Sequence, residues 1–491
     1  MKIKIKESSL AKPAQETPNK PLWTSSLDLL VARVPVPTVY FYKPNGCSNF
    51  FNAQLLKEAL CKALVMFYPV AGRLGYDEKG RLEIKCNGEG VLFVEAETDS
   101  AFDHFNDFAP SLELMQLIPN VDYSGDISSS PLFAFQITSF KCGGVTLGSN
   151  MHHSLADGPS AFHFVNTWAD IARYGSSTST LLLPWHDRTL LQARNPPAPA
   201  FHHIEYDPSP SMVMNTTHLD PPSSSTCTSA VFKVSSEQQN MLKKHKPTSS
   251  STSTGAKYSS YETLAAHIWR SICKARGLAN DQLTKLYIPV DGRSRLNPPL
   301  PPGFFGNAIF SATSTALAGD IQSEPLIDTV GRIYEAVKRI DDDYIRSALD
   351  YLQVQPDLAP LSRGAQTFKC PNLNVNSWSR LPMYDADFGW GRPVFTGPPS
   401  VVLEGMCFIL PKSTIDGSLS LAICLETSHM QLFKDLGQQT MLTGSAEDEA
   451  TKVLAIGSVL GIDFSEVEEE VLVEIARREE EDAARFEALN G

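Results

Sequence analysis

The sequence predicts an α/β protein that folds as two domains. Its 491 residues exceed what a single hydrophobic core usually organises, so two domains are the first expectation. The hydrophobic share of 42% and the charged share of 20% are typical of a globular protein with a well-populated core. Short β-rich runs and helical stretches recur in both halves of the chain, which indicates an α/β domain in each half.

The N-terminal half, to about residue 175, alternates strand and helix signals. Runs of apolar and β-branched residues predict strands, whereas longer amphipathic stretches predict helices. We expect strands near 1–10, 38–44, 90–96, 132–140 and 143–150, and helices over 52–67 and from 158 onwards. In the helix that starts at 158, an apolar stripe is expected from Phe162, Val165, Ala169 and either Ile171 or Tyr174.

The rest of the chain divides by composition. Residues 176–229 are rich in Ser, Pro and Thr with little periodicity, and we expect a crossover linker between the domains there. Residues 230–436 carry the signals of the second α/β domain. These signals predict helices over 259–277 and 325–352, a strand running into a turn over 285–295, and strands over 401–411 and 419–426.

The net charge of −13 is concentrated in the last segment, residues 437–491. From Ser445 to Gly491 there are 14 acidic and 4 basic side chains, so the preceding 444 residues carry only −3. Nothing in this distribution favours nucleic-acid binding. Within the tail, Val467, Val471 and Ile475 recur every four residues, as in a helix with one apolar stripe. A solvated acidic extension is the favoured interpretation, and a docking helix for an unknown partner is the alternative.

The sequence also indicates the cellular compartment. The first residues, MKIKIKESSL, alternate apolar and basic side chains as a strand does and lack the apolar run of a signal peptide. No stretch approaches the roughly 18 apolar residues of a membrane span. The nine cysteines are scattered without CxxC pairs, which suggests reduced thiols. We therefore expect a cytoplasmic protein.

The stretch HHSLADG, residues 152–158, is a candidate for chemistry at a strand-to-helix turn. A metal site of His152, His153 and Asp157 is disfavoured, because adjacent side chains rarely converge on one ion and no further ligand cluster is present. The two histidines are otherwise either structural or include a general base, which would sit well where ligands bind beyond strand ends. Gly158 is expected to allow a sharp turn. The motif alone leaves these interpretations open.

A second motif lies far downstream, where DFGWG occupies residues 387–391. By itself it indicates only a tight structural loop. With HHSLADG before it at this distance, however, the chain resembles the plant BAHD acyl-CoA-dependent acyltransferases. Further matching stretches are YPVAGRL, FKCGGVTLG, YSSYETLAAHIWR, KLYIPVDGRSR and PPLPPGFFGN. The resemblance covers about residues 1–436 and is closest to the family's hydroxycinnamoyltransferases that use shikimate or quinate.

This resemblance implies a fold and an activity. The fold is two similar chloramphenicol-acetyltransferase-like domains with an active-site channel between them, in a monomer. The activity is transfer of a p-coumaroyl or caffeoyl group from CoA to a hydroxyl of shikimate, with no metal and no cofactor, since the CoA thioester is a substrate. Alternatives are the same transfer to quinate or another hydroxy acid, and a non-catalytic relative that only binds its ligand.

The resemblance also assigns residues. His153 would be the general base in a ternary complex, so that no cysteine acts as a nucleophile, and His152 would be structural. Trp378 would support the oxyanion. Asn376, near the acceptor, and Val36 replace threonines of the relatives, and the Asn376 change leaves the preferred acceptor open. Asp157 and Arg293 would form a salt bridge that holds the loop, and Arg363 would bind the acceptor carboxylate. Thr38 and Tyr40 would line the substrate, and Ser259 would contact the CoA phosphates. Asp387 and Trp390 would be structural.

Overall fold

The computed structural model describes residues 1–31, 35–105, 108–123, 125–175, 181–212, 226–244, 258–413 and 416–442. The chain comprises two compact units, Met1–Leu432 and Phe433–Gly491. The apolar stripe expected in the acidic tail lies outside the described residues. Among those residues, no helix is both long enough and apolar enough to cross a membrane.

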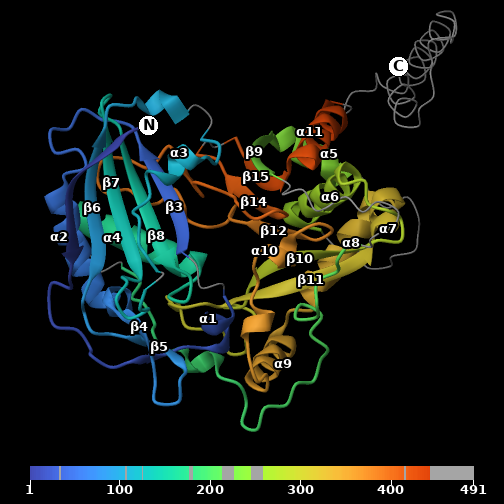
Figure 1. The fold of residues 1–491 in the computed structure, drawn as a ribbon, viewed down its shortest axis with the longest axis horizontal. Coiled ribbons are helices and arrows are strands. Elements are labelled where there is room, and N and C mark those ends of the chain that lie inside the picture. The colour runs from blue at the N-terminus through green and yellow to red at the C-terminus, as the bar shows by residue number, and fades with distance from the viewer. Residues whose placement is uncertain are drawn as a thin grey trace, which may run out of the picture. The chain divides into compact units, whose positions relative to one another are not determined.

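Two six-stranded sheets form the framework of the first unit (Figure 1). The N-terminal sheet has the strand order β1 (Ile3–Ala11), β6 (Val91–Thr98), β7 (Phe133–Phe140), β8 (Val145–His152), β3 (Pro35–Tyr42), β13 (Phe395–Gly397). The C-terminal sheet has the order β11 (Ile309–Leu317), β10 (Leu283–Asp291), β12 (Leu373–Ser377), β14 (Met406–Pro411), β15 (Leu419–Glu426), β9 (Cys227–Val234). Both sheets are mixed: β6–β7, β10–β12 and β12–β14 pair in parallel and the other pairs are antiparallel. A small sheet joins β2 (Leu22–Trp23), β5 (Leu82–Lys85) and β4 (Arg73–Tyr76).

Helices cover these sheets. In the N-terminal half, α2 (Ala53–Met66) packs against α4 (Gly158–Tyr174), and their apolar faces share one core with the inner face of the sheet. In the C-terminal half, α6 (Ser260–Ala275) packs against α8 (Leu326–Lys338) and contacts β12 (Figure 1). The other helices are α1 (Ser26–Leu30), α3 (Leu112–Met115), α5 (Ser236–Lys244), α7 (Ala318–Ser323), α9 (Asp342–Gln353), α10 (Ala365–Phe368), α11 (Thr427–Leu442) and the 3-10 turns η1 (Tyr68–Ala71), η2 (Phe102–Phe105), η3 (Arg188–Leu191) and η4 (Ala359–Leu361).

One strand crosses between the two halves of the chain. β13 follows the DFGWG motif in sequence but pairs antiparallel with β3, so it forms the edge of the N-terminal sheet. Its register places Thr396 opposite Tyr40 and Phe395 opposite Phe41. The C-terminal half of the chain therefore completes the sheet of the N-terminal half.

The expected elements occur, and three of them differ in extent for identifiable reasons. β8 runs two residues beyond the expected end at Asn150, because His152 pairs with Pro35 of β3 and its N–H donates to Leu132. The helix expected over 325–352 is two helices, since Asp341 caps a new helix by accepting from the N–H of Tyr344. The strand expected over 401–411 starts only at Met406, because Gly405 has a φ of +78°.

The described part of the crossover segment, residues 181–212, is bound to both halves. The Asp350 carboxylate of α9 accepts from the Arg194 side chain at 2.6 Å and from the backbone N–H of Ala198 at 2.9 Å. The buried His203 contacts Glu205 and Ser347. Arg188, on η3, is wholly buried beneath the N-terminal half. The domain limits at residues 175, 229 and 436 remain predictions.

We expect Gly148 to be indispensable in β8. A Cβ at this position would lie 1.9 Å from the carbonyl oxygen of Leu117, a backbone atom with no freedom to move aside. Gly148→Ala is therefore expected to lower the free energy of unfolding by about 1 to 3 kcal/mol or more, as over-packing does. Urea unfolding followed by circular dichroism measures this difference.

The matched control is Gly125→Ala, where an added Cβ meets no atom within 4 Å. Its stability is expected to stay within about 0.5 kcal/mol of the unsubstituted protein. Equal effects of the two substitutions would contradict the close packing of Leu117 on β8.

Candidate active site

The HHSLADG motif forms the turn from β8 into α4. His152 is the last residue of β8 and is buried, with its Nδ1 accepting from the N–H of Ser154 at 3.3 Å. Asp157 is the N-cap of α4 and accepts from the N–H of Ser160 at 3.1 Å, which is why the helix starts here. His153 lies between these two fixed points and stays partly exposed. The two neighbouring histidines thus have different surroundings.

Asp157 is held in a closed hydrogen-bond network. Its carboxylate receives two hydrogen bonds from the Arg293 guanidinium, at 2.8 and 2.9 Å, and one from the N–H of Ala308 at 2.9 Å. Burial alone would raise the pKa of Asp157, but Arg293 and the hydrogen bonds outweigh it and hold the pKa below its usual value. The expected Asp157–Arg293 ion pair is present, and it joins the motif turn to the residues that follow β10.

His153 has the surroundings of a neutral imidazole. Burial of the ring lowers its pKa below the usual value, although its own carbonyl oxygen, Asp157, the carbonyl oxygen of Ala156 and the Asn307 side chain oppose this effect. Its Nδ1 is buried and makes no hydrogen bond to the described residues. A neutral ring at neutral pH is the form that accepts a proton from a hydroxyl.

Three residues that support this turn were missed by the sequence analysis. The Asn307 side-chain N–H₂ donates to the carbonyl oxygen of His153 at 3.0 Å and to the Asp28 carboxylate at 2.9 Å. Asp28 in turn lies 3.1 Å from a guanidinium nitrogen of Arg188, and both side chains are completely buried. The Oδ1 of Asn307 is itself buried without a hydrogen-bond partner among the described residues, as is the Nδ1 of His153. The sequence signals that could have found two of them are the family-like stretches PLWTSSLDLL, which contains Asp28, and GFFGN, which contains Asn307.

Aromatic rings connect the motif turn to both sheets. Phe162, in the second turn of α4, lies 6.4 Å from Tyr40 on β3 and 6.0 Å from Trp378, between ring centroids. Trp378 follows β12 and also contacts Phe408 of β14 at 5.2 Å. The structure therefore brings together Tyr40 and Trp378, 338 positions apart in sequence, through Phe162. Thr38 is on the same strand as Tyr40, two residues earlier, and is buried.

The other substrate-binding candidates are more dispersed. Asn376 lies on β12, opposite Phe408, and is partly exposed. Arg363 lies between η4 and α10, with its guanidinium carbon 5.5 Å from the ring centre of Tyr287, and its Nε is buried without a hydrogen bond to the described residues. None of its described contacts is with the motif turn. The structure does not bring Arg363 together with His153.

Ser259 is the N-cap of α6. Its hydroxyl oxygen accepts from the N–H of Glu262 at 3.3 Å, while its own N–H donates to the Glu262 carboxylate at 2.6 Å. This capping box places a carboxylate at the end of the helix where a phosphate would be favoured. Contact of Ser259 with CoA phosphates remains a prediction.

The DFGWG loop lies at the far end of α4. Asp387 accepts from Arg173 at 2.8 Å and from the N–H groups of Gly389 and Gly391 at 2.9 Å, and Trp390 packs against Phe51. Arg173 is 15 residues beyond the start of the helix, which corresponds to roughly 22 Å. Asp387 and Trp390 are thus structural neighbours of α4 and distant from His153.

Gly158 is not needed for a sharp turn, and this expectation is wrong. Gly158 is the first residue of α4 and is absent from the glycines with a positive φ. A Cβ there would meet only Leu381 Cδ1, at an ordinary 3.5 Å. The turn is made by the Asp157 cap instead. No three His, Cys, Asp or Glu side chains gather in the described residues as they do around a metal ion.

Comparison with known proteins places the chain in a family. A model of the Transferase family matches residues 1–440. The chain belongs to that family. Its members are the BAHD acyltransferases, and the protein is an acyl-CoA-dependent acyltransferase. The tail beyond residue 440 lies outside the match.

Relatives cover nearly the whole of the family region. The chain is 56% identical to shikimate O-hydroxycinnamoyltransferase of Nicotiana tabacum, over 88% of this chain and 99% of that protein. It is 54% identical to a hydroxycinnamoyltransferase of Narcissus pseudonarcissus and 50% identical to rosmarinate synthase of Plectranthus scutellarioides, in each case over 89% of this chain and 99% of the relative. The crystal structure of vinorine synthase matches with a TM-score of 0.66 at 23% identity, over 88% of this chain and 96% of that one, which shows the fold.

We expect Asp157→Asn to destabilise the protein by about 3 kcal/mol at neutral pH, because the buried Arg293 then keeps only the more exposed Asp291 as a carboxylate partner. The folded-state pKa of Asp157 is depressed, so its stabilisation is present above the unfolded pKa of about 3.9 and is lost as pH falls through the folded value. The difference between the two proteins should therefore narrow below about pH 4. Thermal unfolding at a series of pH values measures it.

Asp385→Asn is the control, since Asp385 and Arg392 form an exposed ion pair. That substitution is expected to cost less than about 1 kcal/mol. A difference for Asp157→Asn that stays constant down to pH 2 would contradict the role assigned to the ionised carboxylate.

Proposed function

We propose that the protein transfers a hydroxycinnamoyl group, p-coumaroyl or caffeoyl, from CoA to a hydroxyl of shikimate, with His153 as the general base. The observation that carries the proposal is the pair of neighbouring histidines with different environments. His152 is buried in β8, whereas His153 is partly exposed, has a lowered pKa and lies beside a turn fixed by Asp157. The names of the relatives support the acyl group.

In the proposed reaction, a nitrogen of the neutral His153 ring takes the proton of the acceptor hydroxyl. The hydroxyl oxygen attacks the thioester carbonyl carbon, and the electron pair moves onto the carbonyl oxygen. When this pair returns, the carbon–sulfur bond breaks and the imidazolium gives its proton to the departing CoA sulfur. The products are the ester and free CoA thiol, and His153 is again neutral. General-base assistance of this kind contributes about 10²- to 10⁴-fold in rate.

The supporting residues either orient His153 and the substrates or stabilise the oxyanion. The Asn307 amide is placed to fix the His153 backbone, and its unpartnered Oδ1 is a suitable acceptor for the Nδ1 proton of the ring, which would leave Nε2 as the base. The indole N–H of Trp378 is proposed to donate to the developing oxyanion. Tyr40 and Thr38 line the hydroxycinnamoyl group, and Ser259 contacts the CoA phosphates.

Arg363 is proposed to bind the acceptor carboxylate. Its buried, unpartnered Nε and its guanidinium are suited to a bidentate contact with a carboxylate. The cytoplasmic location and the monomeric state belong to this proposal as well.

A non-catalytic ligand-binding relative is the second candidate, and His153 argues against it. A protein that only binds its ligand has no use for a largely buried imidazole whose pKa is kept low by burial. Among catalytic alternatives, quinate or another hydroxy acid is the rival acceptor, because Asn376 carries two separate hydrogen-bonding groups, an N–H₂ and a carbonyl oxygen, where the family resemblance implies the single hydroxyl of a threonine.

We expect His153→Ala to lose at least 10²-fold in kcat with p-coumaroyl-CoA and shikimate, since the base is removed. In the unsubstituted protein, kcat/KM should fall only below about pH 6.5, because the lowered pKa keeps His153 neutral above that value. Thiol release and ester formation measure both. The control is His152→Gln, which keeps a polar side chain of similar size in β8. Full activity of His153→Ala, measured beside this control, would refute the proposed base.

We expect Asn376→Thr to shift acceptor preference. Replacing the amide by a hydroxyl removes one hydrogen-bonding group next to the acceptor, so the ratio of kcat/KM for quinate to that for shikimate should change about tenfold. The ratio is measured with p-coumaroyl-CoA held at saturation. Ser377→Thr, one residue along β12 and on its opposite face, is the control. An unchanged ratio would place the acceptor elsewhere.

A further inference from the structure

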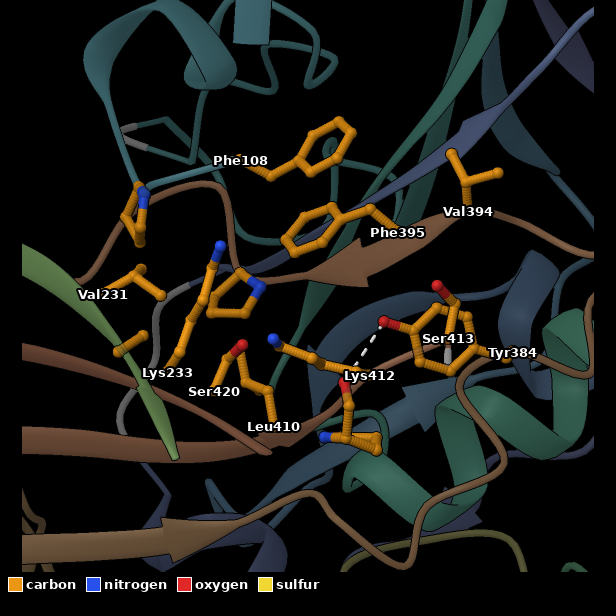
Figure 2. Close-up of a pocket in the computed structure, with 14 residues that line it drawn as sticks. Phe108, Val231, Lys233, Tyr384, Val394, Phe395, Leu410, Lys412, Ser413 and Ser420 are labelled. Atoms are coloured by element: carbon orange, nitrogen blue, oxygen red, sulfur yellow. Dashed lines mark hydrogen bonds between the residues drawn. The ribbon is translucent and has the colours of Figure 1, made fainter. Parts of the chain in front are cut away.

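A cavity lies beside the candidate active site and has its own chemistry. We call it the lysine pocket (Figure 2). It has a volume of about 220 Å³ and is lined by Phe108, Pro110, Val231, Lys233, Tyr384, Val394, Phe395, Pro398, Leu410, Pro411, Lys412, Ser413, Ser420 and Ala422. Pockets for drug-sized ligands usually measure about 300 to 1,000 Å³, so this one suits a smaller molecule with a single ring.

The floor of the lysine pocket is the inner face of the C-terminal sheet. The strand register aligns Leu410, Ser420 and Lys233 in one row across β14, β15 and β9. The next row consists of Phe408, Ala422 and Val231, and Phe408 contacts Trp378. The pocket therefore adjoins the candidate active site by one row of side chains but shares none of the proposed catalytic residues.

An aromatic pair forms the opposite wall. The rings of Phe108 and Phe395 are stacked, with centroids 4.6 Å apart and planes 7° from parallel. Phe108 adopts a φ of +56°, a backbone conformation that is costly for a bulky residue. The surrounding structure thus maintains a strained residue whose ring contributes to this wall, next to Val394 and Pro398. A flat aromatic ligand matches such a surface.

The charge of the lysine pocket is entirely positive. Two of its lining residues are lysines, and none is Asp or Glu. Figure 2 shows the Lys233 and Lys412 side chains extending towards the same space between Ser420 and Phe395. Neither ammonium group has a carboxylate partner among the described residues. The serine hydroxyls beside them can donate further hydrogen bonds to an anion.

We propose that the lysine pocket binds a small aromatic carboxylate, with its ring against Phe108 and Phe395 and its carboxylate between Lys233 and Lys412. A free hydroxycinnamate fits this chemistry, because it joins one ring to one carboxylate. A thioester of CoA does not fit, since its acyl carboxyl carries no charge and its carrier is far larger than the cavity. The site is separate from the one where the acyl group would be transferred.

The test uses the full chain carrying His153→Ala, so that binding is measured without turnover. Titration calorimetry with p-coumarate is expected to show one site. Adding Lys233→Ala and Lys412→Ala together should weaken binding at least tenfold, while adding Lys43→Ala, an exposed lysine outside the pocket, should leave it unchanged. Methyl p-coumarate, which lacks the charge, and cyclohexanecarboxylate, which lacks the aromatic ring, should each bind at least tenfold more weakly.

A second variant distinguishes this pocket from the acyl-group site. Val231→Trp fills the lysine pocket from β9 and is expected to abolish p-coumarate binding. In the chain with His153 intact, the same substitution should leave the KM for p-coumaroyl-CoA within twofold. The proposal is overturned if p-coumarate binding survives Val231→Trp, if the paired lysine substitutions leave it unchanged, or if p-coumaroyl-CoA displaces it competitively. p-Coumaroylshikimate binding as tightly as p-coumarate would likewise overturn it, because that ester is larger than the single-ring carboxylate proposed.

Discussion

The bidentate ion pair between Asp157 and Arg293 is the constraint on which the rest of the site depends. It fixes the start of α4, the end of β8 and the residues after β10 at one point, although they come from both halves of the chain. The Asp157 carboxylate is fully engaged by these hydrogen bonds and by those from the N–H groups of Ala308 and Ser160. Among the described residues no carboxylate hydrogen-bonds the His153 ring, whereas the buried Asn307 amide donates to its backbone carbonyl.

Burial has a different effect on each charged group around this turn. Asp157 and Arg293 satisfy one another and stay ionised despite their burial. His153 has no such ion-pair partner in the part of the chain that the structure describes, so desolvation dominates and lowers the pKa of the ring. Asp28 and Arg188 form a second buried ion pair, at 3.1 Å, and Asn307 links Asp28 to the backbone of His153. Burial thus leaves the paired residues Asp157 and Arg293 charged and structural, whereas it leaves His153 as a neutral ring suited to accept a proton.

Much of the fold and part of the site could be predicted from sequence, and the limits have physical causes. Periodicity located the long elements, and the resemblance to a family supplied the Asp157–Arg293 pair. Local patterns could not locate β13, because three residues of an edge strand carry no period of their own. They also missed Asp28 and Asn307, which are 279 positions apart and meet only in the folded chain. Gly158 was assigned a turn that the Asp157 cap makes instead. The lysine pocket depends on strand register across three strands, which no single stretch reveals.

The edge strand β13 has a consequence for how the protein is made. The N-terminal sheet has its first five strands once His152 has been synthesised, but its edge against β3 stays unpaired until Gly397 emerges, 245 residues later. At about 5 to 20 residues per second, that interval is roughly 12 to 50 s. During this time the backbone N–H and C=O groups on the outer edge of β3 lack the strand β13 with which they later pair. An unpaired strand edge is a common route to association between chains. The growing chain is therefore prone to association with other chains at the β3 edge, which is where β13 joins the two halves of the finished protein.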